Sequence, residues 1–67
     1  MKVSAKEWSL ISAFNASAHP PNHMNVGIPL KCATLVQYGK MPSDKQIKVA
    51  VEIREKAYQD GFDFVSN

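Results

Sequence analysis

The chain has 67 residues, of which 45% are hydrophobic and 21% are charged, and its formal net charge is +2. This composition indicates one small globular domain, residues 1–67, and excludes a disordered chain. The charge is too small to indicate nucleic-acid binding by itself. No apolar run reaches the ~18 residues of a membrane-spanning helix, and the N-terminus lacks the apolar region of a signal peptide, so we expect a cytoplasmic protein without a membrane partner.

A capping box opens the first predicted helix, which runs from residue 5 to about residue 17. The Ser4 hydroxyl can accept the amide of Glu7, and the Glu7 side chain can reach back to the amide of Ser4. The apolar residues of this segment share one broad side of the helix: Trp8, Leu10, Ile11 and Phe14. The polar residues fall mostly elsewhere: Lys6, Ser9, Ser12 and Asn15.

The segment from His19 to Ile28 contains two consecutive prolines, and we expect it to form an extended loop. Pro29 suits the first turn of a second helix, predicted over residues 30–38. Gly39 is then placed to end that helix with a left-handed residue. The expected loop is long for so small a domain, which makes it a candidate recognition surface as well as a connector.

A second capping box, Ser43 with Gln46, opens the third predicted helix at residues 44–60. Gly61 is placed to end it, and Phe62 can fold back on its last turn. Arg54 lies inside the apolar stripe of this helix. We expect its stem to follow the edge of the core and its guanidinium to reach water. The alternative is that Arg54 pairs with an acidic group or a phosphate of a partner.

Together these elements predict an all-α fold, a compact three-helix domain with a proline-containing loop and a short C-terminal arm. The expected core residues are Trp8, Ile11, Phe14, Leu35, Val36, Ile47, Val51 and Tyr58. The alternative is an α+β fold with a small two-stranded element, in which residues 62–65 pair with residues 26–28.

A metal site is the first chemistry to consider, because His19 and His23 flank the two prolines and Cys32 follows. Three ligands fall short of the four that structural zinc requires, and the prolines disfavour a helix that would bring the histidines together. We therefore expect no metal and no cofactor. Cys32 is expected to be buried, and no base is placed to activate it, so we expect no enzyme activity and no catalytic residue.

The segment LVQYGKMPSDKQ, with Leu35, residues 38–40, Ser43 and residues 45–46, resembles a short segment that recurs in small phage and mobile-element proteins of DNA metabolism. The similarity covers about a fifth of the chain. The resemblance implies a compact phage-type accessory protein, many of which bind a host protein or nucleic acid.

Two functions of different class follow from these features. The first is a small accessory protein that binds and modulates or inhibits a protein of a host cell. Its partner-binding residues would be Met24, Met41, Arg54, Phe62 and Phe64, which we expect to be exposed or semi-rigid. The alternative is a helix-turn-helix-like domain that binds nucleic acid through Lys45, Gln46 and Lys48. Weak nucleic-acid binding and a homodimer remain open at this point.

Overall fold

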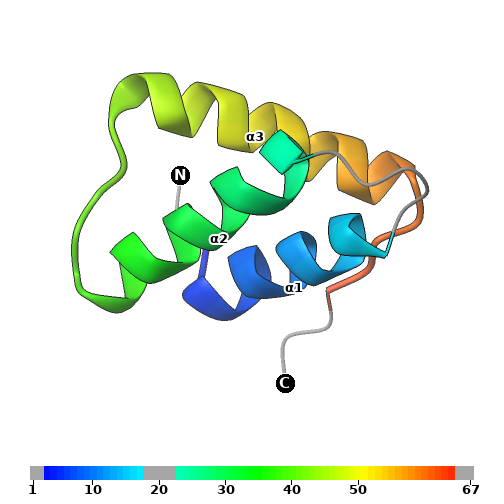
Figure 1. Cartoon of the computed structure of the whole chain (residues 1–67), viewed down its shortest axis with the longest axis horizontal. Coiled ribbons are helices and arrows are strands. Elements are labelled where there is room, and N and C mark those ends of the chain that lie inside the picture. The colour runs from blue at the N-terminus through cyan, green and yellow to red at the C-terminus, as the bar shows by residue number, and fades with distance from the viewer. Residues whose placement is uncertain (1–2, 18–22, 65–67) are drawn as a thin grey trace.

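The computed structural model describes residues 3–17 and 23–64, and in these residues the chain forms three helices and no strand. They are α1 (Ala5–Ala16), α2 (His23–Gln37) and α3 (Asp44–Gln59). Helices α1 and α3 run in the same direction, and α2 runs back against them (Figure 1). The predicted all-α three-helix fold is confirmed. The α+β alternative is wrong, because residues 26–28 belong to α2 and residues 62–64 form no strand.

Helix α1 begins and ends close to the predicted positions. The Ser4 hydroxyl accepts a hydrogen bond from the Glu7 amide at 3.1 Å, so the first half of the predicted capping box is present. The second half is wrong, because the Glu7 carboxylate does not bond the Ser4 amide but bonds α3. Ser17 is the C-terminal cap, and its amide bonds the carbonyls of the last turn.

Helix α2 begins at His23, well before the predicted start at residue 30. The predicted loop is therefore wrong for residues 23–28, and residues 18–22 lie outside the described part of the chain. Pro29 lies inside α2, where the missing amide leaves the carbonyl of Asn25 without its usual helical donor. The Asn15 side chain of α1 supplies that donor at 2.8 Å.

A second bond from α1 supports the same stretch of α2. The Ser12 hydroxyl donates to the carbonyl of Val26 at 2.8 Å. Ser12 and Asn15 are consequently buried against α2, although the amphipathic pattern of α1 placed them on a polar side. Burial of these two groups is stable because each one is hydrogen-bonded. The helix can tolerate Pro29 because Asn15 provides the one bond that the proline removes, and the Ser12 bond to Val26 adds support beside it.

Two glycines in the left-handed region end α2 and α3, as predicted. At Gly39 φ is 73°, and the amide of Lys40 bonds the carbonyl of Leu35 at 2.8 Å. At Gly61 φ is 107°, and the amide of Phe62 bonds the carbonyl of Ala57 at 2.9 Å. Both turns have the bond from the second residue beyond the helix cap that defines a Schellman motif.

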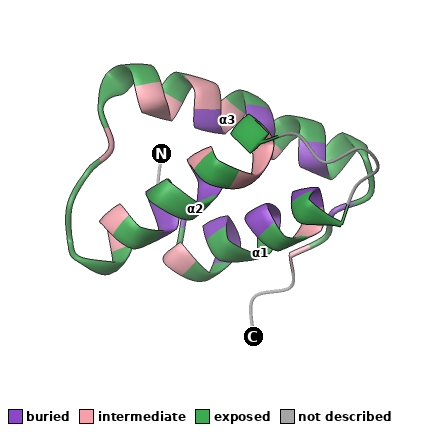
Figure 2. Ribbon diagram, in the orientation of Figure 1, coloured by how far each residue is buried: buried purple, intermediate pink, exposed green. Residues whose placement is uncertain are grey.

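The capping box at the start of α3 is also confirmed. The Ser43 hydroxyl accepts the Gln46 amide at 3.3 Å, and the Gln46 side-chain oxygen accepts the Ser43 amide at 3.2 Å. This box fixes the point at which the chain leaves the connection between α2 and α3. Most of that connection, residues 38–43, is exposed (Figure 2).

Small residues contribute more to the core than the sequence pattern indicates. The buried hydrophobic residues are Val3, Trp8, Ile11, Cys32, Ala33, Ala50, Ile53, Ala57 and Phe62. Of the predicted core, Trp8 and Ile11 are buried, whereas Phe14, Leu35, Val36, Ile47 and Val51 are half-buried. Tyr58 is 36% exposed, so its assignment to the core is wrong. No helix in the described residues combines the length and hydrophobicity needed to span a bilayer.

Candidate functional site

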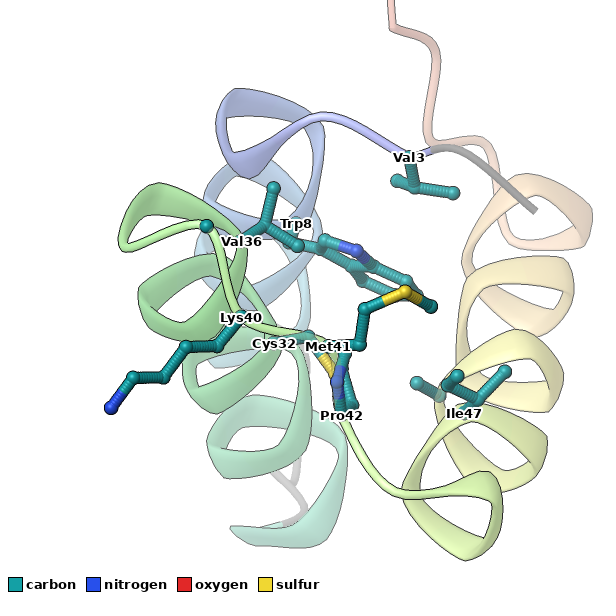
Figure 3. A pocket seen from close by; sticks show the side chains of 10 residues that line it. Val3, Trp8, Cys32, Val36, Lys40, Met41, Pro42 and Ile47 are labelled. Carbon is teal, nitrogen blue, oxygen red and sulfur yellow. The ribbon is translucent and has the colours of Figure 1, made fainter.

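An apolar pocket of about 310 Å³, which we name the Trp8 pocket, lies between the helices. Its lining residues come from the segment before α1, from all three helices and from the connection between α2 and α3: Val3, Trp8, Cys32, Val36, Gly39, Lys40, Met41, Pro42, Ile47 and Ala50. Figure 3 shows the Trp8 indole in the middle of the pocket, between Val3 and the side chain of Ile47. A pocket of this size and character is typical of small apolar binding sites.

Local structure explains why the pocket exists. The left-handed turn at Gly39 ends α2 and directs the chain along the mouth of the pocket before the Ser43 cap starts α3. Met41 is 76% exposed on this connection and still lines the pocket. The connection therefore borders the cavity without filling it. As a result, parts of the apolar side chains of Ile47 and Trp8 face the cavity instead of packing against other side chains.

The lining of the Trp8 pocket is almost entirely apolar and includes one thiol, Cys32, and one charged side chain, Lys40. Burial raises the pKa of the Cys32 thiol, against the opposing effect of the Lys31 charge, so the thiol stays protonated near neutral pH. A protonated thiol is a poor nucleophile. The Lys40 side chain points away from the cavity (Figure 3). Within the lining, Trp8 carries the one aromatic ring and an indole N–H.

A polar cluster lies at the opposite half of α3, where Glu7 meets two side chains. The Glu7 carboxylate oxygen Oε2 accepts a hydrogen bond from Arg54 Nε at 2.6 Å and another from the Tyr58 hydroxyl at 3.0 Å. The Arg54 guanidinium also lies 5.0 Å from the centre of the Tyr58 ring, in cation–π geometry. Both partners therefore bind Glu7 and contact each other.

This cluster changes the titration of Tyr58. Loss of solvent raises the pKa of the Tyr58 hydroxyl, and the hydrogen bond to Glu7 and the negative charge of Glu7 raise it further. The Arg54 charge has the opposite effect, and the Asp63 charge a small raising one. The hydroxyl therefore remains a hydrogen-bond donor to Glu7 well into the alkaline range.

Both predictions for Arg54 leave out its main contact. The side chain is 30% exposed, and its Nε pairs with the Glu7 carboxylate of the same chain. Pairing of Arg54 with a partner stays a prediction. The sequence does contain a signal for this pair. Glu7 precedes Ile11 by four residues and Phe14 by seven, so it lies within the apolar stripe of α1, as Arg54 lies within that of α3. Opposite charges in two facing apolar stripes favour an internal ion pair.

The remaining predicted partner-binding residues differ in how exposed they are and in whether they line the Trp8 pocket. Phe62 is 8% exposed and packs edge-to-face against Phe14 at 5.5 Å and Tyr58 at 5.1 Å, so it is a core residue rather than part of an exposed arm. Phe64 is half-buried and packs against the core. Met24 is exposed in the first turn of α2 and lines a different, shallower pocket. Met41 alone of the five lines the Trp8 pocket.

The residues of the nucleic-acid alternative lie in the first turns of α3. Lys45 and Lys48 are exposed, but the Gln46 side chain is engaged in the capping box. Asp44 brings a negative charge to the same turn. A base-contacting surface would need a free Gln46 side chain and a stronger positive field.

No three histidine, cysteine or acidic side chains in residues 3–17 and 23–64 gather closely enough to hold a metal ion. His23 is exposed at the start of α2, and His19 lies outside the described residues. No motif in the sequence marks the Trp8 pocket, because its residues come from separate segments and are ordinary core types. Comparison of the chain with protein-family models, curated proteins and solved structures found no match.

Proposed function

We propose that this protein is a non-enzymatic binding module that docks onto another protein through the Trp8 pocket and the connection between α2 and α3. The observation that carries the proposal is the apolar pocket of about 310 Å³, bordered by an exposed connection. Two large side chains of the same connection, Tyr38 and Met41, are exposed, and Met41 lines the pocket. Aromatic and methionine side chains around an apolar depression are typical of protein interfaces.

The surface favours a protein over a nucleic acid as the partner. Lys40 is the one charged residue among those that line the pocket, and α3 presents cations and anions together on its exposed face. Phosphate binding would depend on clustered cations. The partner, in the phage-type setting that the LVQYGKMPSDKQ resemblance implies, would be a host protein that this chain modulates or inhibits in the cytosol.

Affinity capture with matched variants tests the proposal. Immobilised wild-type protein and its Met41→Glu and Met24→Glu variants are exposed to the same nuclease-treated cell lysate. Both substitutions place a charge on an exposed methionine, but Met41 lines the Trp8 pocket and Met24 does not. We expect Met41→Glu to weaken binding at least tenfold, because a charge in an apolar interface is unfavourable by more than about 1.4 kcal/mol. Met24→Glu should bind as wild type does.

Other outcomes of this experiment contradict the proposal. A partner retained equally by all three proteins, or lost with Met24→Glu alone, would place the interface elsewhere. Sequence-preferring DNA binding that survives about 200 mM salt and is lost in a Lys45→Ala, Lys48→Ala variant would favour the nucleic-acid function instead. Self-association that Met41→Glu abolishes would identify the partner as a second copy of this chain.

A further inference from the structure

Among the described residues, the indole N–H of Trp8 is a hydrogen-bond donor without an acceptor. Trp8 is only 5% exposed, yet no hydrogen bond joins its nitrogen to an acceptor in residues 3–17 and 23–64. The fully buried polar side-chain atoms of the same residues all have partners. The nitrogen therefore keeps some contact with solvent. In Figure 3 it lies on the edge of the ring that is turned toward the Val3 side of the pocket.

This donor determines what the pocket can hold. In the free protein, water can satisfy the indole N–H through the opening of the pocket. An occupant that displaces water without offering an acceptor would leave the donor buried and unsatisfied, which is unfavourable even when the rest of the contact is good. A purely hydrocarbon occupant is therefore selected against at this one position of an otherwise apolar cavity.

The charge of the lining indicates which acceptor is suitable. The pocket has no acidic residue in its lining, and Lys40 is its single charged residue. The lining therefore has no carboxylate that would repel an oxygen with partial or full negative charge, and none that would pair with a cation. In a protein partner, an apolar side chain and a carbonyl oxygen always occur close together, so one short segment can supply both.

We propose that the Trp8 pocket recognises an apolar side chain of its protein partner together with an adjacent oxygen acceptor, which receives a hydrogen bond from the indole N–H of Trp8. This inference rests on the proposed function, because it names the chemistry of the partner segment at the same site. Trp8 acts as the specificity-determining residue, and the apolar walls around Ile47 and Val36 provide the rest of the contact.

The test uses two small probes of nearly the same shape, acetophenone and α-methylstyrene, which differ in a C=O against a C=CH₂ group. The chain has one tryptophan, so the ¹⁵N-labelled protein has one indole N–H resonance. We expect acetophenone to move this proton resonance downfield, as a new hydrogen bond does, while α-methylstyrene does not. Methyl resonances of Val36 and Ile47 should change with both probes, which reports that both enter the pocket.

The two probes also differ in how strongly water solvates them. This difference cancels when the ratio of their affinities is compared between the wild type and two variants. In Trp8→Phe the ring remains but the donor is lost, so the preference for the ketone over the alkene should fall by about fivefold relative to wild type. Met41→Ala alters the wall without touching the donor, and it should leave that preference unchanged. The wild-type resonance is decisive if Trp8→Phe does not fold.

The outcomes separate this inference from the proposed function. If both probes enter and the indole resonance responds equally to both, the acceptor inference is wrong, while capture of a partner that depends on Met41 would still support the binding function. If neither probe changes the pocket resonances at millimolar concentration, the pocket does not admit apolar groups, and both proposals fail.

Discussion

The two halves of α3 meet the rest of the molecule in different ways. The C-terminal half buries Ile53 and Ala57 in the core. Two of its side chains, Arg54 and Tyr58, bond Glu7 of α1. Beyond its end, Phe62 folds back onto the last turn and is buried. The N-terminal half buries Ala50, and with this residue and the half-buried Ile47 it lines a pocket that its neighbours do not fill. A small domain can thus obtain its stability from one half of a helix and leave the other half available for binding.

The largest change in stability is expected from substitutions of two isoleucines, one in each half of α3. Ile53 is 7% exposed in the C-terminal half, whereas Ile47 lines the pocket and is half-buried. We expect Ile53→Ala to lower the free energy of unfolding by about 3 kcal/mol, and Ile47→Ala by about 1 kcal/mol or less. Urea unfolding followed by circular dichroism measures both.

A domain of this size has roughly 3 to 5 kcal/mol of stability, so Ile53→Ala could be largely unfolded. The smaller substitutions Ile53→Val and Ile47→Val then allow the same comparison, with losses in the free energy of unfolding of about one third of those for alanine. Equal losses at the two positions would contradict the view that α3 is held chiefly by its C-terminal half.

The second prediction concerns the ion pair. Glu7→Gln removes the charge that binds Arg54 and Tyr58 while keeping the size of the side chain. We expect the free energy of unfolding to fall by about 1 to 2 kcal/mol, which is less than for a fully buried pair because Arg54 is 30% exposed. Glu55→Gln, at an exposed position of α3, should change stability by less than about 0.5 kcal/mol.

A double-mutant cycle isolates the pair itself. Arg54→Met in the Glu7→Gln background should be less destabilising than Arg54→Met alone, because the charge left without its partner is then absent. Strict additivity of the two changes would mean that the contact between Glu7 and Arg54 contributes little to the stability of the C-terminal half.

The third prediction addresses the N-terminal half of α3. Ser43→Ala removes the acceptor of the Gln46 amide and should lower stability by about 1 kcal/mol, whereas Ser43→Gly should lower it by only a few tenths. Hydrogen exchange of the amides of residues 46–50 should accelerate in Ser43→Ala, while that of residues 56–59 changes only with global stability. Uniform acceleration along α3 would show that the helix responds as one piece.

The smallest effect is expected at high pH. The pKa of Tyr58 is raised above the ordinary value of 10.0, so its contribution to stability is complete below pH 10. As the pH rises past 10, the unfolded chain loses the proton first, and the contribution is lost as the pH passes the raised folded-state value. Wild type should thus lose more stability than Tyr58→Phe between pH 9 and pH 11.

Absorbance titration of the Tyr38→Phe protein, which retains one tyrosine, measures the pKa of Tyr58 directly. Adding Glu7→Gln should lower this pKa, because the negative charge is removed and the neutral amide oxygen is a weaker hydrogen-bond acceptor than the carboxylate. A titration that Glu7→Gln leaves unchanged would mean that desolvation alone causes the shift.

The ends of the helices were largely predictable from the sequence, because capping depends on residues close together in the chain. Ser43 with Gln46, Gly39 and Gly61 all act as their local patterns indicate. The start of α2 was not predictable in this way. Pro29 suggested a first turn, and the reason that it lies inside the helix is found in α1, at Ser12 and Asn15.

The candidate site was harder to predict than the fold. The residues that line the Trp8 pocket come from separate segments of the chain, so no local sequence pattern marks the pocket. Met41 was identified as a binding residue from its place on a connection, and it does line the pocket. Phe62 was assigned to an exposed arm, because the sequence did not reveal the aromatic partners Phe14 and Tyr58 that bury it.

The hydrogen bonds from Ser12 and Asn15 of α1 to carbonyls of α2 near Pro29 also mean that the two helices should unfold together. A segment with residues 23–37 alone would lack the Asn15 amide and the Ser12 hydroxyl, so its N-terminal turns should be frayed in isolation. In the intact chain, separation of α1 from α2 would expose those carbonyls and release the proline-interrupted turns together. Helices α1 and α2 should therefore behave as a single cooperative unit, with α3 able to loosen from its N-terminal end while that unit stays folded.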